Sequence, residues 1–377
     1  MSTVAIKKCS SYEKKALLEA VANCLALLGG MEKFVKRGEA VLVKPNLLAP
    51  KPPEAAVTTH PEVVRAVLAL LKDAGACPVV GDSPGLGSAR KAAEKSGILE
   101  VCSGMGVELI ELKDLIVADN PKGRTFRKLE VAREALEAGC IINVPKLKTH
   151  AQMYLTMAVK NMFGCVPGKL KAQWHLSAGV ESHHFASMLL ELCLFLSPRL
   201  SIMDAITAME GNGPGSGDPR HLGLIFASEN PVALDAVASA VVGASTDDVP
   251  LLRAAREAGL SEAIATNNLV LGETVESVRV RGFKFPPLSS TNFTDHLPWF
   301  IDRPLRKALT ARPHIENGKC TLCGVCVAVC PAGVMEKTGR IEITYDRCIR
   351  CYCCQEMCPE GAISAKNGWL KRLLPGL

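Results

Sequence analysis

The chain has 377 residues, of which 48% are hydrophobic and 22% are charged, and its formal net charge is +6. These values fit an ordinary soluble globular protein of two or three domains, and neither the modest charge nor any sequence motif argues for nucleic-acid binding. No run approaches the roughly 18 apolar residues of a membrane span, and the N-terminus lacks the apolar core of a signal peptide, so we expect a cytoplasmic protein without a transmembrane segment.

Apolar runs alternate with amphipathic runs over residues 1–283. Short apolar runs closed by Pro, Asn or Gly predict strands, and amphipathic runs that end at Gly predict helices. The expected strands span 39–46, 77–81, 107–112, 140–144, 199–205, 222–227 and 275–280, and the expected helices span 13–28, 60–76, 88–96, 130–138, 184–196, 230–243 and 249–258. Residues 145–150 and the Gly-rich segment 209–220 are expected to be loops. The alternation implies an α/β fold with a mainly parallel sheet covered by helices.

Polar side chains gather where these strands end. In an open α/β sheet, ligands bind at the carboxyl ends of the strands. The polar residues found there, together with two from the segment MAVKNMFG, are Lys44, Asn46, Asp82, Ser83, Lys146, Lys148, His150, Lys160, Asn161, Asp204 and Glu210. We assign Lys146, His150 and Asp82 as candidate catalytic groups. The other eight are candidates for binding a cofactor or substrate.

Four of these residues are lysines that would together form a cationic cleft: Lys44, Lys146, Lys148 and Lys160. Such a cleft suits a phosphate or a carboxylate, because lysine binds an anion as a point charge. The alternative, in which these lysines are solvated loop residues, stays open. His150 follows a strand and is the better histidine candidate for proton transfer or metal binding, whereas His60 also fits the cap of a helix.

Residues 284–312 are rich in Pro and lack periodicity, which predicts a linker. Four aromatic residues indicate that this linker packs onto a domain: Phe285, Phe293, Trp299 and Phe300. A tail at 367–377 contains Trp, Leu and basic residues. We expect the tail to dock on its own protein, with contact to a membrane surface as the alternative.

Residues 313–366 contain a duplicated cysteine motif. Its halves, at 320–331 and 348–359, both read C-x2-C-x2-C-x3-C-P, and each cysteine of the first recurs 28 positions later (348 − 320). This is the signature of a bacterial-type ferredoxin with two [4Fe-4S] clusters, in which the fourth cysteine of each half ligates the other cluster. One cluster is expected to take Cys320, Cys323, Cys326 and Cys358, and the other Cys348, Cys351, Cys354 and Cys330. The region should therefore form a small α+β ferredoxin-like domain.

Other uses of these cysteines fit less well. Zinc prefers separated cysteine pairs or Cys/His sets, and disulfides would need an oxidising compartment, of which the sequence gives no sign. Cys353 lies inside the second triplet beside Cys354. We interpret it as a free thiol, with an exchange of ligand between the two neighbours as the alternative. Because such clusters are generally oxygen-sensitive, we expect the source to be an anaerobe.

Seven motifs of the α/β region occur together: VKPNLL, TTHPEVV, GDSPG, INVPKLKTH, VKNMFG, DAITAMEGNGPGSG and PVALDAVA. Together they resemble the family known as domain of unknown function 362, across about 4–283. The resemblance implies an α/β domain often joined to a ferredoxin-type module, but no reaction, because the family lacks a settled one. VLVKPN and THPEVV are also faintly similar to the strand, T-x-P turn and helix of the nickel-pincer lactate racemase group. This chain lacks that group's paired catalytic histidine motifs, which argues against racemase chemistry.

The leading hypothesis is an iron–sulfur oxidoreductase or electron-transfer protein. Electrons would pass through the clusters to or from an anionic substrate or organic cofactor in the α/β domain, because tethering raises the effective concentration of the clusters there. The expected partner is a redox protein or a small anionic molecule. One alternative is a non-enzymatic carrier or adaptor whose α/β domain docks a redox partner. Another is a non-redox enzyme whose clusters sense redox state or stabilise the fold.

Overall fold

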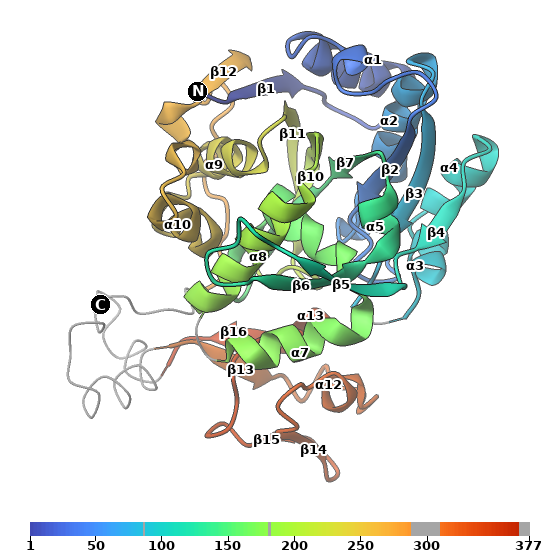
Figure 1. Cartoon of the computed structure of the whole chain (residues 1–377). Helices are drawn as coiled ribbons and strands as arrows, with labels where there is room; N and C mark the ends of the chain where they lie inside the picture. Colours follow the sequence, from blue (N-terminus) through green and yellow to red (C-terminus); the bar gives the residue numbers. More distant parts are fainter. Residues whose placement is uncertain (86, 180–181, 288–309, 369–377) are drawn as a thin grey trace.

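The structure is a computed structural model that describes residues 1–85, 87–179, 182–287 and 310–368. It comprises a large α/β domain and a small C-terminal domain of short strands and helices (Figure 1). Within these ranges, no helix is both long enough and apolar enough to span a membrane.

The expected linker falls largely outside the described residues. The predicted contacts of Phe293, Trp299 and Phe300 and most of the predicted tail lie outside them. Phe285 is described, and its ring stacks on that of Tyr154 with the ring centroids 4.7 Å apart. The Phe285 end of the predicted linker therefore packs on the α/β domain, whereas Arg312 at its other end already belongs to a strand of the C-terminal domain.

A mixed sheet of ten strands organises the α/β domain, in the order β12-β1-β11-β10-β7-β2-β3-β4, with β8 paired to β10 and β9 paired to β8. Its strands are β1 Thr3–Lys8, β2 Ala40–Pro45, β3 Cys77–Asp82, β4 Leu109–Glu111, β7 Cys140–Val144, β8 Lys146–His150, β9 Tyr154–Thr156, β10 Leu200–Glu210, β11 Asp218–Ser228 and β12 Leu269–Gly272. Neighbours from β4 to β10 pair in parallel, as do β1 and β12. Only β11 and β9 are antiparallel to the strands they pair with in this sheet. The predicted mainly parallel sheet is confirmed.

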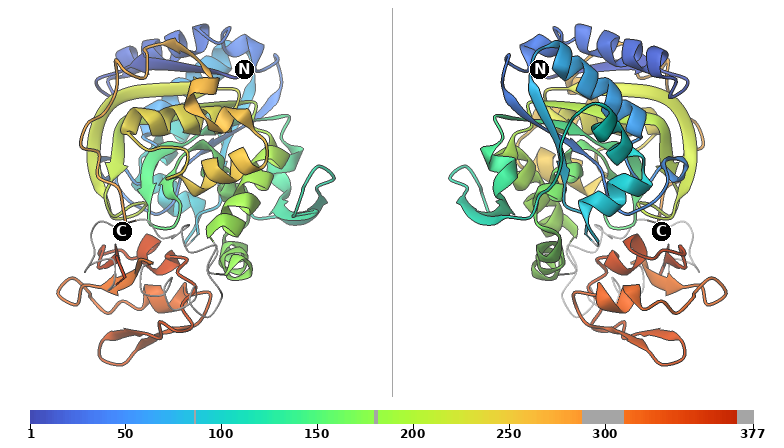
Figure 2. Two further views of the ribbon diagram at one scale, coloured as in Figure 1. Left: turned by 90° about the vertical axis from the view of Figure 1, so that its left-hand side faces the viewer. Right: turned by 90° about the vertical axis from the view of Figure 1, so that its right-hand side faces the viewer.

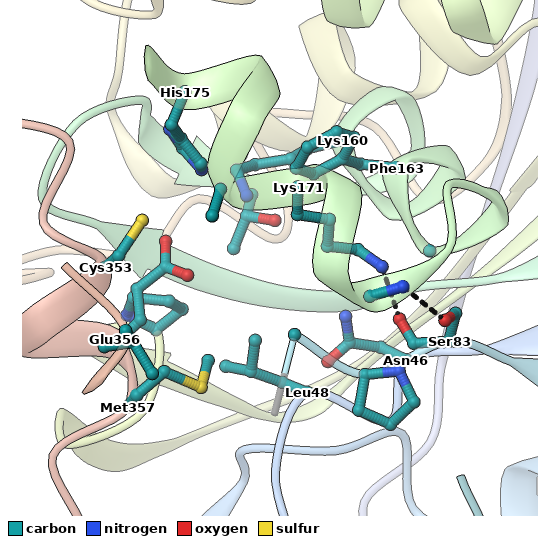
Figure 3. Close-up of a pocket in the computed structure, with 18 of the residues that line it drawn as sticks. Asn46, Leu48, Ser83, Lys160, Phe163, Lys171, His175, Cys353, Glu356 and Met357 are labelled. Atoms are coloured by element: carbon teal, nitrogen blue, oxygen red, sulfur yellow. Dashed lines mark hydrogen bonds between the residues drawn. The ribbon is translucent and has the colours of Figure 1, made fainter. Parts of the chain in front are cut away.

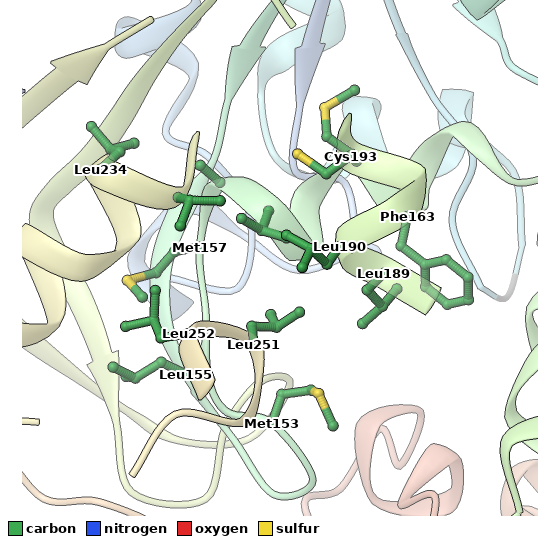
Figure 4. Packing of buried hydrophobic residues seen from close by; sticks show 14 of the residues in the cluster. Met153, Leu155, Met157, Phe163, Leu189, Leu190, Cys193, Leu234, Leu251 and Leu252 are labelled. Atoms are coloured by element: carbon green, nitrogen blue, oxygen red, sulfur yellow. The ribbon is translucent and has the colours of Figure 1, made fainter. Parts of the chain in front are cut away.

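Helices cover both faces of this sheet (Figures 1 and 2). One face carries α1 Lys14–Ala26, α2 Pro61–Asp73, α3 Ala89–Lys95 and α4 Ile98–Gly104, and the other carries α6 Ala158–Asn161, α8 Ser182–Leu196, α9 Pro231–Val242 and α10 Pro250–Glu257. Each face of the sheet forms a hydrophobic core with its helices, the first core under α1–α4 and the second under α6 and α8–α10. Side chains alternate between the faces of a strand, so Val41 and Val43 of β2 join the first core and Leu42 joins the second. Figure 4 shows part of the second core, to which α8 contributes Leu190 and α10 contributes Leu252. Full burial of one such side chain contributes roughly 1.5–3 kcal/mol.

Side-chain caps fix where two of these helices begin. The His60 imidazole accepts a hydrogen bond from the backbone N–H of Glu62 (3.2 Å) at the start of α2. Asn230 accepts hydrogen bonds from the N–H groups of Val232 (2.9 Å) and Ala233 (3.1 Å) at the start of α9. A cap of this kind contributes about 1 kcal/mol. His60 therefore has the structural role that the sequence allowed for it.

The predicted helix at 130–138 is wrong over its first half. There β6 Lys128–Ala132 pairs with β5 Leu115–Asp119 in a separate hairpin, and only α5 Arg133–Glu137 is helical. The alternating burial of KLEVA is the strand signal. The good helix formers that follow in Arg133–Glu137 favoured the prediction of one continuous helix.

Two further segments differ from prediction. Residues 145–150 form β8 instead of a loop, because pairing with β9 and β10 buries this lysine-rich run completely. Residues 275–280 are not a strand; the edge strand is β12, a few residues earlier. The Gly-rich loop is shorter than predicted, at 211–217, because β10 and β11 extend into both of its ends.

The C-terminal domain consists of two similar halves. Its elements are β13 Arg312–Ile315, α12 Val325–Ala328, β14 Met335–Lys337, β15 Ile341–Ile343, α13 Cys353–Glu356 and β16 Ile363–Lys366. The outer strands β13 and β16 pair with each other, as do β14 and β15. The predicted small ferredoxin-like domain is thus confirmed, and Figure 2 shows it packed against one end of the α/β domain.

Candidate functional site between the two domains

A cavity of about 340 Å³ lies between the α/β domain and the ferredoxin-like domain (Figure 3). Its α/β wall comes from the ends of β2 and β3, from β8 and α6, and from two further elements, the 3₁₀ helix η3 Met162–Cys165 and α7 Gly168–Ala178. The ferredoxin-like domain contributes Cys330, Pro331, Cys353, Glu356 and Met357. The volume lies at the lower end of the range for small-molecule sites, roughly 300–1,000 Å³.

Eight of the eleven polar residues that the sequence singled out line this cavity: Lys44, Asn46, Asp82, Ser83, Lys148, His150, Lys160 and Asn161. Six of them share one edge of the sheet, because parallel strands present their carboxyl ends on the same side, and Lys160 and Asn161 come from α6. The remaining three, Lys146, Asp204 and Glu210, do not line it.

Lys44 and Asp82 form a buried ion pair in the cavity wall, with Lys44 Nζ 2.8 Å from Asp82 Oδ1. The Asp82 carboxylate also accepts hydrogen bonds from the backbone N–H groups of Leu47 (2.7 Å) and Ser83 (2.8 Å). Gly164 packs directly on the pair, and a Cβ at this position would collide with both charged groups. The pair is therefore a fixed part of the wall, and Asp82 has few lone pairs left for acid–base work.

Lys148 is tied to a chain of side-chain amides. Its Nζ donates to Asn46 Oδ1 (2.8 Å) and to the backbone carbonyl of Val57 (2.7 Å). Asn46 Nδ2 donates in turn to Asn161 Oδ1 (3.1 Å). Burial, helped by repulsion from Lys160, lowers the pKa of Lys148 to about 7. Lys148 therefore titrates near neutrality in the absence of a ligand.

Two cavity residues that the sequence reasoning missed lie on α7. Lys171 Nζ donates to the backbone carbonyls of Ser83 and Val166, both at 2.6 Å. Burial lowers the pKa of Lys171 to about 7 and that of His175 to about 3. Their four-residue spacing places both on one face of the helix, and this is the signal that could have found them.

His150 meets a carboxylate from the ferredoxin-like domain. Its Nδ1 accepts hydrogen bonds from the N–H groups of Gln152 and Met153, both at 3.1 Å, so the neutral ring carries its proton on Nε2. Nε2 lies 2.5 Å from Glu356 Oε1. Burial, with repulsion from Lys160, lowers the pKa of His150 to about 4. Burial opposes ionisation of Glu356, but His150 and Lys160 outweigh it and hold the pKa of Glu356 well below its usual range.

Lys146 and Asp204 belong to a second buried network, outside the cavity. Lys146 Nζ lies 2.7 Å from Asp204 Oδ2, and the Tyr12 hydroxyl donates to Asp204 Oδ1 (2.9 Å) and accepts from Lys146 Nζ (3.1 Å). Glu210 accepts a hydrogen bond from the backbone N–H of Lys284 (3.0 Å). These groups are satisfied within the protein, so their positions indicate structural roles.

Polar contacts hold the ferredoxin-like domain on the Gly-rich loop 211–217. Gln355 Nε2 donates to the backbone and side-chain oxygens of Asn212 (2.8 and 3.0 Å) and to the next backbone carbonyl (3.1 Å). Gly215 packs on the backbone carbonyl of Glu356, where a Cβ would stand 2.5 Å from the oxygen. This loop therefore sets where α13 meets the cavity.

The predicted cluster ligands surround two small cavities within the ferredoxin-like domain. Cys320, Cys323, Cys326 and Cys358 line one, and Cys330, Cys348, Cys351 and Cys354 line the other. This is the crossed grouping expected for two cubane clusters. The N–H groups four residues after Cys330 and Cys358 donate to their sulfurs (3.5 and 3.3 Å).

The large cavity and one cysteine-lined cavity share a wall. Cys330 and Pro331 border both. Cys353 is half-buried and borders the large cavity, whereas its neighbour Cys354 borders the cysteine-lined one. This arrangement fits Cys353 as a thiol outside the ligand set.

The fold and the cysteine pattern define an iron–sulfur protein with the capacity for electron transfer, built on a mainly parallel α/β domain. Comparison with known families agrees with this class: residues 312–359 match the 4Fe-4S dicluster domain. Residues 41–240 match Domain of unknown function (DUF362). The chain belongs to the DUF362 family, as its motifs predicted.

One relative is the thylakoid-associated protein sll1697 of Synechocystis sp., which is 42% identical over 286 residues that cover 76% of this chain and 88% of the relative. A similar solved structure is the lactate racemase apoprotein from Thermoanaerobacterium thermosaccharolyticum, with 11% identity and a TM-score of 0.42. That match covers 63% of this chain and 57% of the racemase, so the chain spans little more than half of the racemase's length. The cytoplasmic location and the anaerobic source expected from the sequence remain predictions.

Proposed function

We propose that this protein is an iron–sulfur oxidoreductase that passes electrons through two [4Fe-4S] clusters to or from an anionic substrate or cofactor in the 340 Å³ cavity. The observation that carries the proposal is the wall of Cys330 and Pro331, which borders both this cavity and a cysteine-lined one. A cluster in the smaller cavity would exchange single electrons with its surroundings. A ligand in the larger cavity would lie directly beside one of its cysteines.

The eight cysteines suit this role as ligands. They fall into two sets of four, each closed by the last cysteine of the other half, and a backbone N–H donates to one sulfur of each set. Such N–H bonds to sulfur are one of the means by which a protein sets a cluster's potential.

The charges of the cavity lining favour an anionic ligand. Four ammonium groups face two carboxylates, which leaves an excess of two positive charges (4 − 2) if all are ionised: Lys44, Lys148, Lys160 and Lys171 against Asp82 and Glu356. Uncompensated buried charge is costly. A thiolate-bound cluster next to the cavity would compensate part of the excess, and a bound anion the rest.

His150 is the catalytic candidate that best keeps its predicted role. Its Nδ1 is held by two backbone N–H groups, so Nε2 carries the proton toward Glu356 at the cavity wall. An N–H held in this position can donate a hydrogen bond that stabilises negative charge on a ligand that has received electrons. Asp82 serves instead as the partner of Lys44, and Lys146 lies outside the cavity.

The test uses full-length protein purified without oxygen. We expect about eight irons per chain and the absorption and EPR spectra of [4Fe-4S] clusters. A small molecule released on denaturation is then identified by mass spectrometry and added to protein whose clusters have been reduced with dithionite. The molecule should speed the reoxidation of the clusters, and zinc in place of iron would end the proposal.

A matched pair of histidine variants separates the cavity from the clusters. His150→Gln should slow reoxidation by the ligand while leaving reduction by dithionite unchanged. His183→Gln, at an exposed position on α8, should change neither rate. If a redox protein accepts the electrons at the same rate with the cavity empty and with His150 replaced, the chain is a carrier rather than an oxidoreductase.

A further inference from the structure

Three of the four lysines around the cavity already have acceptors within the protein. Lys44 pairs with Asp82, Lys148 donates to Asn46 and a backbone carbonyl, and Lys171 donates to two backbone carbonyls. An ammonium group held by two or more protein acceptors can offer only its remaining N–H to a ligand. These three lysines therefore shape the wall and supply charge.

Lys160 differs from the other three. It lines the cavity and is half-buried, yet within the described part of the chain its Nζ has no hydrogen-bond or ion-pair partner. Its Nζ lies over the Phe163 ring, 5.8 Å from the ring centroid. The backbone that carries it is fixed, because the Asp235 carboxylate accepts the N–H groups of Ala158 and Val159 at the start of α6 (2.7 and 3.0 Å). Lys160 is thus a positioned cation whose Nζ is not hydrogen-bonded within the described residues, although its charge acts through space on the Glu356 carboxylate.

His175 is a second residue of the cavity lining that has an unmatched polar atom. The side chain is only 4% exposed, it lines the cavity, and its Nδ1 has no hydrogen-bond partner among the described residues. Burial lowers its pKa to about 3, with Lys160 contributing repulsion, so the ring is neutral at pH 7. A neutral imidazole offers one N–H donor. A buried polar atom without a partner costs about 1–3 kcal/mol, which a ligand would relieve.

We propose that Lys160 and His175 bind the carboxylate of a small organic acid, whose apolar body lies along Phe163, Leu48 and Met357 of the cavity wall. This inference rests on the proposed function, for which it names the class of ligand. One cation and one neutral N–H donor match the two oxygens of a carboxylate. A phosphate would bring more charge and more acceptor oxygens than these two groups satisfy, beside the Glu356 carboxylate and a cluster cysteine.

The experiment uses anaerobically prepared full-length protein with its clusters and measures binding by isothermal titration calorimetry. The probes are benzoate, the uncharged benzyl alcohol and inorganic phosphate. The variants are Lys160→Met and His175→Phe, with Lys91→Met as the control because Lys91 is exposed on α3, away from the cavity. Iron content and circular dichroism establish that each variant is folded and loaded.

We expect benzoate to bind the native protein more tightly than benzyl alcohol or phosphate does. Lys160→Met and His175→Phe should each weaken benzoate binding by about tenfold to a hundredfold, since each removes a hydrogen bond to a charged group. Lys91→Met should bind like the native protein. Equal binding of benzyl alcohol, tighter binding of phosphate, or unchanged affinity in a folded Lys160→Met variant would overturn the inference.

The same samples separate this inference from the proposed function. If benzoate binding depends on Lys160 and His175 but no carboxylic acid reoxidises the reduced clusters, the ligand class stands and the redox role fails. If cluster reoxidation requires the cavity but a non-carboxylate molecule is responsible, the redox role stands and the ligand class fails.

Discussion

Replacing Gly215 by alanine should loosen the ferredoxin-like domain from the α/β domain. A Cβ at this position would stand 2.5 Å from the backbone oxygen of Glu356, whereas real Cβ atoms keep at least 3.0 Å from such atoms, so the two segments must separate by at least 0.5 Å (3.0 − 2.5). The obstacle is backbone, which cannot rotate away as a side chain does. The separation also strains the 2.8–3.1 Å hydrogen bonds from Gln355 to the same loop. Overpacking of this kind costs about 1–3 kcal/mol.

Amide hydrogen exchange of the full-length, cluster-loaded protein measures this cost directly. If docking of the domain protects loop 211–217 and α13, a loss of 1–3 kcal/mol should speed their exchange by about 5- to 150-fold. Gly318→Ala is the control, because Gly318 lies in the ferredoxin-like domain and a Cβ there meets nothing within 4 Å. Native exchange rates in Gly215→Ala, or an equal increase in the control, would refute the account of the interface.

Three further predictions concern single residues. Cys330→Ser should remove about half of the iron, and Cys353→Ser should remove none, as iron analysis per chain will show; equal losses would contradict the crossed ligand sets. Lys146→Met strands the buried Asp204 carboxylate and should lower the free energy of unfolding in urea by about 3–5 kcal/mol, and an unchanged value would argue against a structural role. Burial raises the pKa of Asp235 to about 7, so from about pH 4 to 7 the folded state holds a proton that the unfolded state has lost. The free energy of unfolding, measured in urea, should therefore fall by about 1.4 kcal/mol per pH unit as the pH rises from about 4 to 7, and Asp235→Asn should flatten this slope.

Local sequence patterns predicted an element correctly where the hydrophobic period and the capping residues indicated the same structure. The helix at 60–76 carries its cap, its Pro and its closing Gly in the sequence, and α2 begins and ends within a few residues of that prediction. The prediction of a loop at 145–150 was wrong because polar residues such as Lys146 and Lys148 are typical of solvated loops. Pairing with the adjacent β9 and with the distant β10 turns Lys146–His150 into a buried strand, and the pairing with β10 is tertiary information that no local period contains.

The site was predictable to the extent that strand ends determine it. Lys44 and Asp82 follow neighbouring parallel strands, so their meeting followed from topology. Lys146 follows the same rule in sequence but pairs with Asp204 elsewhere, because the rule gives the edge of the sheet and not the direction of each side chain. The position of Glu356 in the cavity wall could not be predicted from the sequence, since it depends on how a separate domain docks.

The crossed grouping of the cysteines places one set of four beside the large cavity and the other set away from it. Cys330 is the fourth cysteine of the first half, but it belongs to the set of Cys348, Cys351 and Cys354. Residues 328–331 around it line the large cavity, and α13 of the second half contributes Glu356 to the same wall. The set that contains Cys330 therefore lies against the cavity. The other set includes the exposed Cys323, and none of its four cysteines lines the large cavity. In the proposed function, the first set exchanges electrons with the bound acid, and the second set is the one that a redox partner can approach from solvent.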